Sequence, residues 1–397
     1  MAQNPVTGTL KTPNQHNVFN CVLNEAQYTL MFPPQVGHIE TFGLVTDQAD
    51  WEAKRSDPNF QAPGMQPGIG ELRRFERKVF VSGKLVMPDG VEIRHWGFED
   101  ENGVKTLPSS PIRVMAGDLV QVTLSSAKNR HTIHHHGLEP DMDNDGVGHT
   151  SFEVLGNYTY QWRPHVANAG TFFYHCHVNT TLHVQMGLFG ALVIDPYEPE
   201  PHPDGKKPFE DAPWRYKPEF ERFWVPYAID PRWHTLHHLA GFCLEDAGLN
   251  RFEPKYFLLG KHPQHPDGSP ILGDAEQPVA LTMPVGETAY IRLIESTYHP
   301  VRVDLGALGA STMVVEADGR GLRDGISLTG LGLDHAPQPL GWDDWQPGNP
   351  RKEIGPAERY GLIVQPTTPG VYPVEFAFHH WISGEKLGFA RTQVTVV

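Results

Sequence analysis

A cysteine set between two histidines, in the run Tyr-His-Cys-His at residues 174–177, is the first feature of this chain that could do chemistry. Adjacent side chains of a β-strand point to opposite faces. If this run ends a strand, Cys176 points to one side, and His175 and His177 point to the other. The spacing therefore predicts a thiolate ligand of one metal centre directly behind two imidazole ligands of a second centre, with the peptide between them as a path for electrons.

The residues that follow Cys176 match the needs of a blue-copper centre, which uses two imidazoles, one thiolate and a weak axial ligand such as methionine. Cys176 would supply the thiolate and His183 the downstream imidazole. Met186 is the predicted axial ligand. The remaining imidazole must come from the end of an earlier strand, where His131 stands.

A second group of imidazoles is predicted from residues 131–137, which read His-Thr-Ile-His-His-His-Gly. In an extended segment, His134 and His136 point to the same side. Together with His175 and His177 they would form a four-imidazole group. Neutral imidazole suits copper, and Cu(II) heads the affinity order of the divalent first-row metals. Zinc is the alternative for a Cys/His set, but the paired spacing and the methionine favour copper.

The acceptors that hold such imidazoles in one tautomer are also predicted from the sequence. Metal-bound histidines usually donate their second ring N–H to a carboxylate or a carbonyl. Asp141, Asp143 and Asp145 lie close in sequence to the first histidines and are the expected partners. Three further histidines, His234, His237 and His238, are better explained as part of a surface loop than as ligands.

Composition excludes several classes of function. The chain has 397 residues, a net charge of −15, and is rich in glycine (39) and proline (36), which favours short strands joined by turns. The negative charge argues against nucleic acid or an anionic membrane as the main partner. No apolar run reaches the ~20 residues of a membrane-spanning helix. Cys21 and Cys243 could pair or remain free thiols, and no disulfide framework is implied.

The pattern along the chain predicts an all-β protein with two sandwich domains. We expect an irregular N-terminal arm at residues 1–75, a first domain at 76–197, a Pro-rich linker at 198–220 and a second domain at 221–397. The two halves look like repeats, since His131 and His299 each follow a Gly-acid pair and a strand. The predicted strands are at residues 119–124, 158–162, 170–177, 188–194, 223–228, 255–259, 287–294, 360–364 and 393–397.

These segments together resemble the multicopper oxidases, and within them the two-domain, laccase-like members that are related to copper nitrite reductases. The matching segments are residues 131–137, 145–147, 169–177 and 186–194. The resemblance implies cupredoxin-like Greek-key domains, a type 1 copper at Cys176 and type 2 and/or type 3 copper at the four imidazoles. It also implies a homotrimer. The first residues lack the charged and apolar regions of a signal peptide, so we expect either a periplasmic or extracellular protein whose signal peptide is not present in this chain, or a cytoplasmic protein. In an enzyme of this kind, a small-molecule or metal-ion reductant would pass electrons to O2 at a copper cluster between subunits.

The second half departs from the family pattern. Arg302 and Asp304 stand where the family has histidines. His380 is then the expected ligand from the partner domain, and His299 the expected catalytic residue in proton transfer. His183 also lies further from Cys176 than is usual, which leaves Leu188 as the alternative to Met186. Two other functions stay open: a nitrite reductase-like enzyme with a mononuclear type 2 copper, and a copper-binding electron carrier whose second site has degenerated.

Overall fold

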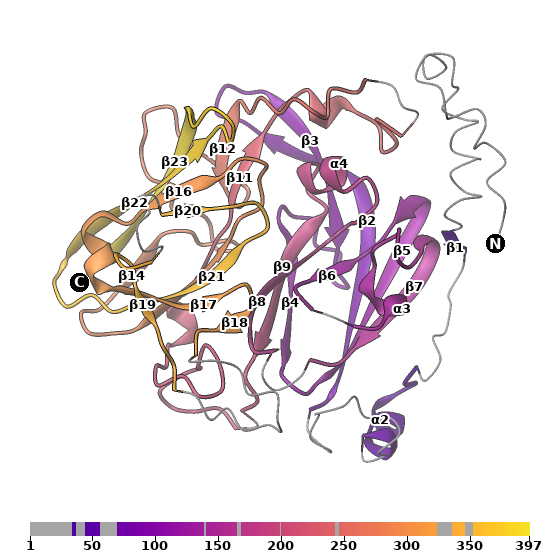
Figure 1. The fold of residues 1–397 in the computed structure, drawn as a ribbon, viewed down its shortest axis with the longest axis horizontal. Helices are drawn as coiled ribbons and strands as arrows, with labels where there is room; N and C mark the ends of the chain where they lie inside the picture. The colour runs from indigo at the N-terminus through magenta and orange to yellow at the C-terminus, as the bar shows by residue number, and fades with distance from the viewer. Residues whose placement is uncertain are drawn as a thin grey trace.

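The computed structural model describes residues 34–36, 44–55, 70–138, 140–164, 168–198, 200–242, 246–323, 336–345 and 352–397. Cys21 and Cys243 lie outside these ranges, so their pairing stays a prediction. The described residues are mainly β-strands, arranged in two halves that lie side by side (Figure 1). The all-β prediction is confirmed.

Two sheets make up the first half. One has the strand order β1-β7-β5-β2-β3 and the other β4-β9-β8-β6. Their bounds are β1 (Pro34–Val36), β2 (Leu72–Val86), β3 (Glu92–Glu99), β4 (Ser109–Met115), β5 (Leu119–His131), β6 (His134–His136), β7 (Glu153–Trp162), β8 (Gly170–His175) and β9 (Phe189–Asp195). Side chains of both sheets meet in one core, where Val122 of β5 and Ile112 of β4 are fully buried.

The second half repeats this plan with two larger sheets, β10-β15-β21-β17-β18 and β14-β23-β22-β16-β20, and a small sheet β11-β12-β13. The first of these comprises β10 (Glu221–Trp224), β15 (Ala289–Ile294), β17 (Thr312–Ala317), β18 (Arg320–Gly321) and β21 (Arg359–Val364), with β19 (Leu340–Gly341) also paired to β17. The second comprises β14 (Leu281–Met283), β16 (Val301–Asp304), β20 (Glu353–Ile354), β22 (Gly370–His379) and β23 (Lys386–Val396). The small sheet comprises β11 (Pro226–Ile229), β12 (Tyr256–Leu259) and β13 (His262–Pro263).

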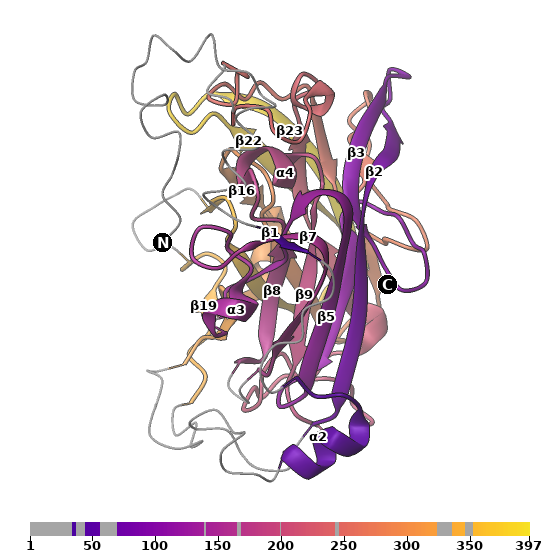
Figure 2. The same cartoon turned by 90° about the vertical axis from the view of Figure 1, so that its right-hand side faces the viewer.

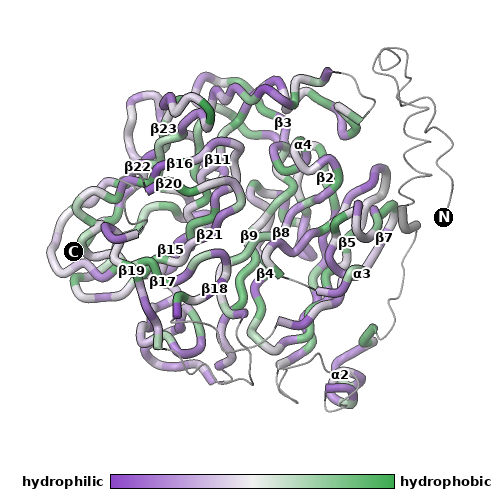
Figure 3. Tube along the Cα trace, viewed as in Figure 1, coloured by the Kyte–Doolittle hydropathy of each residue, from purple (hydrophilic) through white to green (hydrophobic). Residues whose placement is uncertain are grey.

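Each predicted strand overlaps a strand of the structure, although the sheets are not purely antiparallel. Parallel pairs join β2 to β5, β4 to β9 and β10 to β15. All residues of β8 are buried, as are all but the last of β9, because both strands lie between the other sheet of their own half and the second half. Figure 3 shows the hydrophobic colour along β9 that follows from this position.

The expected irregular arm contains regular structure. A short helix, α2 (Gln48–Lys54), begins where the Asp47 side chain accepts a hydrogen bond from the Asp50 N–H at 2.8 Å. Trp51 anchors the helix, since it is fully buried against Val45 and Leu119. Figure 2 shows α2 at the end of the first half opposite to the helix α4 (Thr180–Gln185). Seven residues are too few for a helical period to stand out in a sequence.

The Pro-rich linker is also packed rather than free. Phe209, Ala212 and Tyr216 are buried against Tyr290 and Ile363 of the second half. A bridge between Lys206 and Tyr216 closes the segment into a loop. The apolar residues among the prolines therefore make it part of the second half's surface, and the domain boundaries given above stay a prediction.

A buried network of charges holds the two halves together. Arg292 of β15 is 1% exposed and donates to Glu221 at 2.7 Å and to the Thr171 hydroxyl of β8 at 2.8 Å. Arg113 of β4 pairs with Asp195 at 2.7 Å and also contacts Glu221. Each buried charge in this network has a partner of opposite charge, so removing one partner should lower the free energy of unfolding.

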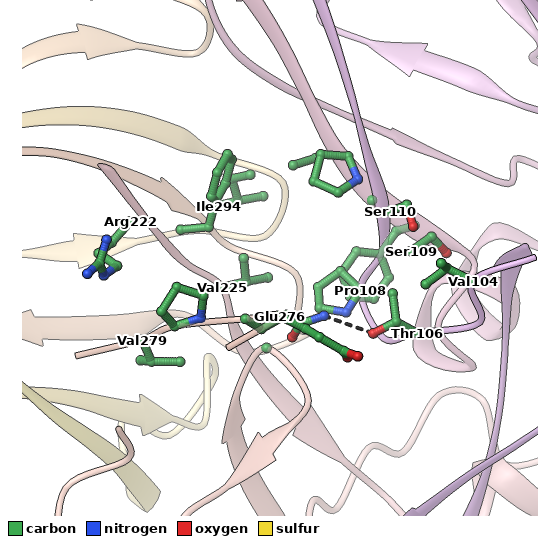
Figure 4. Close-up of a pocket in the computed structure, with 18 of the residues that line it drawn as sticks. Val104, Thr106, Pro108, Ser109, Ser110, Arg222, Val225, Glu276, Val279 and Ile294 are labelled. Carbon is green, nitrogen blue, oxygen red and sulfur yellow. Dashed lines mark hydrogen bonds between the residues drawn. The ribbon is translucent and has the colours of Figure 1, made fainter. Parts of the chain in front are cut away.

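A cavity of about 410 Å³ lies at the same boundary (Figure 4). The first half contributes Thr106 and Pro108, and the second half contributes Val225 and Ile294. Gln277 bridges the halves, because its amide donates to the Thr106 hydroxyl at 2.9 Å. The boundary thus combines apolar packing with specific polar contacts.

Replacing Arg292 with methionine should lower the free energy of unfolding by about 3–5 kcal/mol, because Glu221 would lose its best-buried partner. The same change at Arg222, whose guanidinium donates to the backbone carbonyls of Glu219, Glu221 and Ala280, should cost less than about 1 kcal/mol. Urea unfolding followed by tryptophan fluorescence measures both. Equal losses in the two variants would show that the network does not hold the halves together.

Candidate metal centres

The first candidate centre lies where two strand ends and one helix meet. His131 ends β5, Cys176 follows β8, and His183 belongs to α4. The Cys176 Sγ lies 3.6 Å from the His131 Nδ1 and 3.3 Å from the His183 Nδ1. All three side chains are buried, and their ligand atoms lie within 4.8 Å of one another. The structure therefore brings together the three strong ligands predicted for type 1 copper.

The environment keeps these ligands neutral when no metal is bound. Burial lowers the pKa of His183 to about 3 and that of His131 well below its usual value. Burial raises the pKa of the Cys176 thiol to about 12. A metal that binds here must therefore displace the thiol proton, as thiolate ligation requires.

The predicted axial ligand, Met186, is fully buried in the same core. Its carbonyl accepts a hydrogen bond from the Trp96 N–H at 2.7 Å, which fixes the end of α4 to β3. The Trp96 indole meets the His183 ring edge to face, with ring centroids 5.3 Å apart. The axial role of Met186 stays a prediction.

A segment of the second half, residues 233–242, covers this centre; we call it the capping segment. The His183 Nε2 donates to the His238 carbonyl at 3.1 Å, and Asn179 donates to the carbonyls of His238 and Ala240 at 3.1 and 2.9 Å. Because a carbonyl can only accept, the His183 proton is on Nε2, and its Nδ1 lone pair is free to face Cys176. The sequence did not predict this cap, since residues 233–238 resemble an ordinary surface loop.

The second candidate centre is the four-imidazole group. Strand β6 pairs with β8 so that His134 lies opposite His175. The ligand atoms of His134, His136 and His175 lie within 4.8 Å of one another. The His177 ring is 5.4 Å from that of His134 and 5.7 Å from that of His175. The structure therefore gathers all four predicted imidazoles on the side of β8 opposite to the Cys176 thiol.

Hydrogen bonds set the tautomers of two of these rings. The His134 Nδ1 donates to the Asp145 carbonyl at 2.8 Å, and an Asp145 carboxylate oxygen lies 3.3 Å away. The His175 Nδ1 donates to the Cys176 carbonyl at 3.0 Å. Both rings therefore present an unprotonated Nε2 as the ligand atom for a metal, and the His175 Nε2 lies 3.2 Å from the His136 Nδ1. Asp145 is in the position that the sequence predicted for one of the three aspartates.

His135, between the two β6 ligands, points the other way. It is fully buried, and its ring lies 5.0 Å from that of Trp162 and 5.7 Å from that of Tyr160. Burial lowers its pKa to about 3. The alternation of a strand thus separates a core histidine from two candidate ligands.

A cavity of about 320 Å³ opens onto the four imidazoles, and the second half of the same chain closes it. The described residues that line it from the second half are Glu295, Ser296, Thr297, Tyr298, Pro356 and Ala357. None of these is a histidine. Glu295, an acid that no motif in the sequence pointed to, thus belongs to the cavity wall where the family pattern would place imidazoles, although its side chain is 0% exposed.

His299 and His380 lie elsewhere, beside each other, with ring centroids 5.1 Å apart. Strand β16 pairs with β22 as β6 pairs with β8, and His380 directly follows β22 as Cys176 directly follows β8. His299 precedes Arg302 by the interval that separates His131 from His134. In their own chain, His299 and His380 thus lie together where β16 begins and β22 ends, and neither is among the described residues that line the imidazole cavity.

Comparison with known proteins places these centres in a family. The sequence profile of the multicopper oxidase family matches residues 88–199, which include every candidate ligand of both groups in the first half. The copper-containing nitrite reductase of Neisseria meningitidis is 29% identical over 150 residues, 36% of each chain. Copper resistance protein A of Pseudomonas syringae pv. tomato is 37% identical over 99 residues, which are 24% of this chain and 16% of that protein. Residues 88–199 are therefore similar in sequence to a multicopper oxidase domain.

Solved structures show the same fold across a longer part of the chain. The multicopper oxidase mgLAC superposes with a TM-score of 0.54 at 22% identity, covering 82% of this chain and 86% of that one. A multicopper oxidase from Campylobacter jejuni gives 0.53 at 18% identity, covering 92% of this chain and 62% of that one. The two halves are cupredoxin folds. The chain spans about a third or less of the length of the curated relatives named above.

The side chains present fit copper. A buried thiol with two imidazoles matches a type 1 site, and imidazoles that present an unprotonated Nε2 suit type 2 or type 3 copper. Within the described residues, no helix is long and apolar enough to span a membrane.

The buried imidazoles predict how the copper-free protein responds to acid. The pKa of His135, His136 and His183 is about 3 in the folded chain, against ~6.5 when unfolded. Stability is therefore fully present above about pH 6.5 and is lost as the pH falls, by up to about 1.4 kcal/mol per pH unit for each histidine.

Replacing His135 with phenylalanine should reduce this slope by about 1.4 kcal/mol per pH unit between pH 6 and 5, because one proton-binding group is removed from the unfolded chain. Urea unfolding of chelator-treated protein at several pH values measures the slope. The exposed His265, replaced in the same way, should leave it unchanged. A slope that stays the same in the His135 variant would contradict a neutral buried ring.

Proposed function

We propose that this protein is a copper-dependent oxidoreductase, a laccase-like oxidase that takes single electrons from a reductant and delivers them to O2. The observation that carries the proposal is the placement of two ligand groups on opposite sides of one peptide, His175-Cys176. When bound, copper would supply one-electron relay at the first group and O2 binding at the second. His131, Cys176, His183 and Met186 would hold the first, and His134, His136, His175 and His177 the second.

The chain itself supplies the route between the groups. His175 and Cys176 are covalent neighbours, and the His175 Nδ1–H bonds to the Cys176 carbonyl at 3.0 Å. An electron can therefore leave the thiolate side and reach the imidazole side through a few bonds without side-chain movement. The buried core around Cys176 keeps the ligand geometry rigid, which favours fast electron transfer.

The four imidazoles favour the oxidase over the two alternatives. A mononuclear type 2 site would need only His136, His175 and a third imidazole, and it would leave His134 and His177 without a role. Both of these rings lie with the others, and His134 is held by Asp145 in the tautomer that suits ligation. An electron carrier would need none of the four.

The assembly belongs to the same proposal. In a homotrimer, the second half of a neighbouring chain could bring His380 as a further ligand and His299 as a proton-transfer residue. Within one chain, the rings of His299 and His380 lie beside each other, and neither residue is among the described residues that line the imidazole cavity. A periplasmic or extracellular location and a small-molecule or metal-ion reductant complete the proposal.

Replacing Cys176 with serine should abolish the intense visible absorption of type 1 copper and lower O2 consumption by more than about 100-fold, because no thiolate remains to relay electrons. Replacing Met186 with leucine should keep the colour and change the reduction potential. Optical spectra and redox titration measure both. A blue Cys176 variant would refute the first centre, and an unchanged potential in the Met186 variant would leave Leu188 as the alternative.

Replacing His177 with alanine should reduce copper by at least about one ion per chain while the type 1 absorption persists, because this ring serves only the second group. The wild type should hold about three or more ions per chain, since the first group accounts for one. Metal analysis and electron-spin resonance measure these amounts, with exposed His265 replaced as the control. About two ions in the wild type would favour a nitrite reductase-like site, and about one an electron carrier.

A further inference from the structure

The end of helix α4, which contains His183 and leads into Met186, is held in place from outside the helix. The Tyr227 hydroxyl, from β11 of the second half, donates to the Gln185 carbonyl. The next carbonyl, that of Met186, accepts the Trp96 N–H of β3 at 2.7 Å. The last carbonyls of a helix have no partner within the helix. These two contacts therefore fix where α4 ends.

The Gln185 side chain continues this attachment to the second half. Its amide nitrogen donates to the Ala228 carbonyl at 2.9 Å and lies 3.3 Å from the His234 Nε2. The His234 Nδ1 is in turn 2.6 Å from the Arg94 carbonyl of β3. The Arg94 guanidinium also donates to the Leu236 carbonyl at 2.8 Å. A chain of hydrogen bonds thus runs from α4 through the capping segment to β3.

The carbonyls at the two ends of this chain determine where its protons are. A carbonyl only accepts, so His234 has its proton on Nδ1 and offers Nε2 as an acceptor. For the same reason, the Gln185 amide nitrogen must face the Ala228 carbonyl. Burial lowers the pKa of His234 to about 4, which keeps the ring neutral at neutral pH. One orientation of the Gln185 amide therefore satisfies both acceptors, and the flipped orientation satisfies neither.

This orientation leaves the other atom of the amide without a partner. Gln185 is 1% exposed, and its Oε1 is buried without a hydrogen bond among the described residues. A buried oxygen without a hydrogen bond is unfavourable. An apolar side chain would avoid that loss, so the stability of the fold alone does not explain a glutamine at this position. The two N–H groups that hold α4 in one orientation do explain it.

We propose that Gln185 and His234 are positioning residues that fix α4 relative to Cys176 and thereby set the reduction potential of copper in the first centre. This role rests on copper binding at that centre, which is part of the proposed function. Met186 directly follows Gln185, and His183 precedes it by two positions. A displacement of Gln185 would therefore move both residues. The potential of a thiolate copper site depends on its weak axial ligand, so small displacements of Met186 are enough to change it.

A general role in docking the two halves is the competing interpretation, and Gln277 separates it from a positioning role. Gln277 is also a glutamine whose amide joins the halves, since it donates to the Thr106 hydroxyl at 2.9 Å and the Leu107 carbonyl at 3.2 Å. Both partners belong to the loop before β4, and neither belongs to α4. Gln277→Leu is therefore the matched control for Gln185→Leu.

The first test uses the copper-free protein. Nitrogen NMR of histidine-labelled protein should show that the His234 ring is protonated at Nδ1 and unprotonated at Nε2 near neutral pH, with His234→Phe identifying the signals. The Nε2 signal should shift in Gln185→Leu, because that variant removes its hydrogen-bond donor, and should stay in place in Gln277→Leu. A ring protonated at Nε2 in the wild type, or an Nε2 signal unaffected by Gln185→Leu, would overturn the proposal.

The second test measures the reduction potential of the copper-loaded protein. Gln185→Leu should keep the type 1 absorption and the copper content. Its ratio of reduced to oxidised copper at a fixed potential should rise by about tenfold, or about 59 mV for one electron, because a less firmly held thioether donates less charge to oxidised copper. Gln277→Leu should keep the wild-type potential. An equal rise in both glutamine variants would show a docking effect and overturn the positioning role.

A double-mutant cycle tests whether the two residues act as one unit. His234→Phe should raise the potential in the same direction as Gln185→Leu, and the double variant should show no more than the larger of the two single shifts. Two shifts that add in full would mean that the residues act independently, contrary to the proposal. If Gln185→Leu does not fold, His234→Phe carries the comparison with Gln277→Leu, since it removes only the acceptor of one amide N–H.

The failure of this role and that of the proposed function give different results. If the copper-loaded wild type has no type 1 absorption, the first centre is wrong, and the role of Gln185 and His234 falls with it. If the wild type has that absorption and consumes O2 while Gln185→Leu keeps the wild-type potential, the positioning role is wrong and the oxidase function stands.

Discussion

The peptide between His175 and Cys176 is the constraint on which the rest of the structure depends. Two adjacent residues at the end of β8 must point in opposite directions, and each must meet other ligands on its own side. The thiol side therefore requires His131 from β5 and His183 from α4, which fixes how the two sheets of the first half face each other. The imidazole side requires β6 to pair with β8 in one register. A shift of one residue in that register would send His135, rather than its neighbours, toward His175.

Placing these groups in a protein interior is energetically unfavourable until a metal binds. The folded copper-free chain holds a neutral thiol whose pKa is raised to about 12 beside imidazoles whose pKa values are lowered by burial. Metal binding replaces weak contacts, such as the 3.6 Å approach of Cys176 to His131, with ligand bonds. The surrounding core must therefore supply the stability that the empty centres lack. Tyr174, which is fully buried and bonded to Arg77 and to the Ser110 carbonyl, is part of that core directly beside the ligands.

The ligands of the first half could be predicted from the sequence because their spacing is local. His134 and His136 are two positions apart, so they lie on one face wherever the segment is extended, and His131 precedes them by three and five positions. The cap over His183 and the acid at Glu295 could not be predicted in this way. Both depend on how the second half docks, and that docking is decided by contacts such as Arg292 to Thr171, between residues more than a hundred positions apart. Helix α2 and the packed linker were missed for a simpler reason, since single buried residues such as Trp51 and Phe209 produce no period.

The two halves have diverged into different roles on one fold. In the second half, Arg302 and Asp304 stand at the positions of His134 and His136, and Asp304 is exposed and caps the Gly306 N–H at 2.8 Å. The second half instead covers the first: the capping segment closes the thiol side, and Glu295 closes the imidazole side. His183 is fully buried and donates its outer N–H to the His238 carbonyl. If the protein acts as the proposed oxidase, electrons from a reductant would therefore have to cross the capping segment, and the second half, which lacks the imidazole motifs, would influence which reductants can donate to the first.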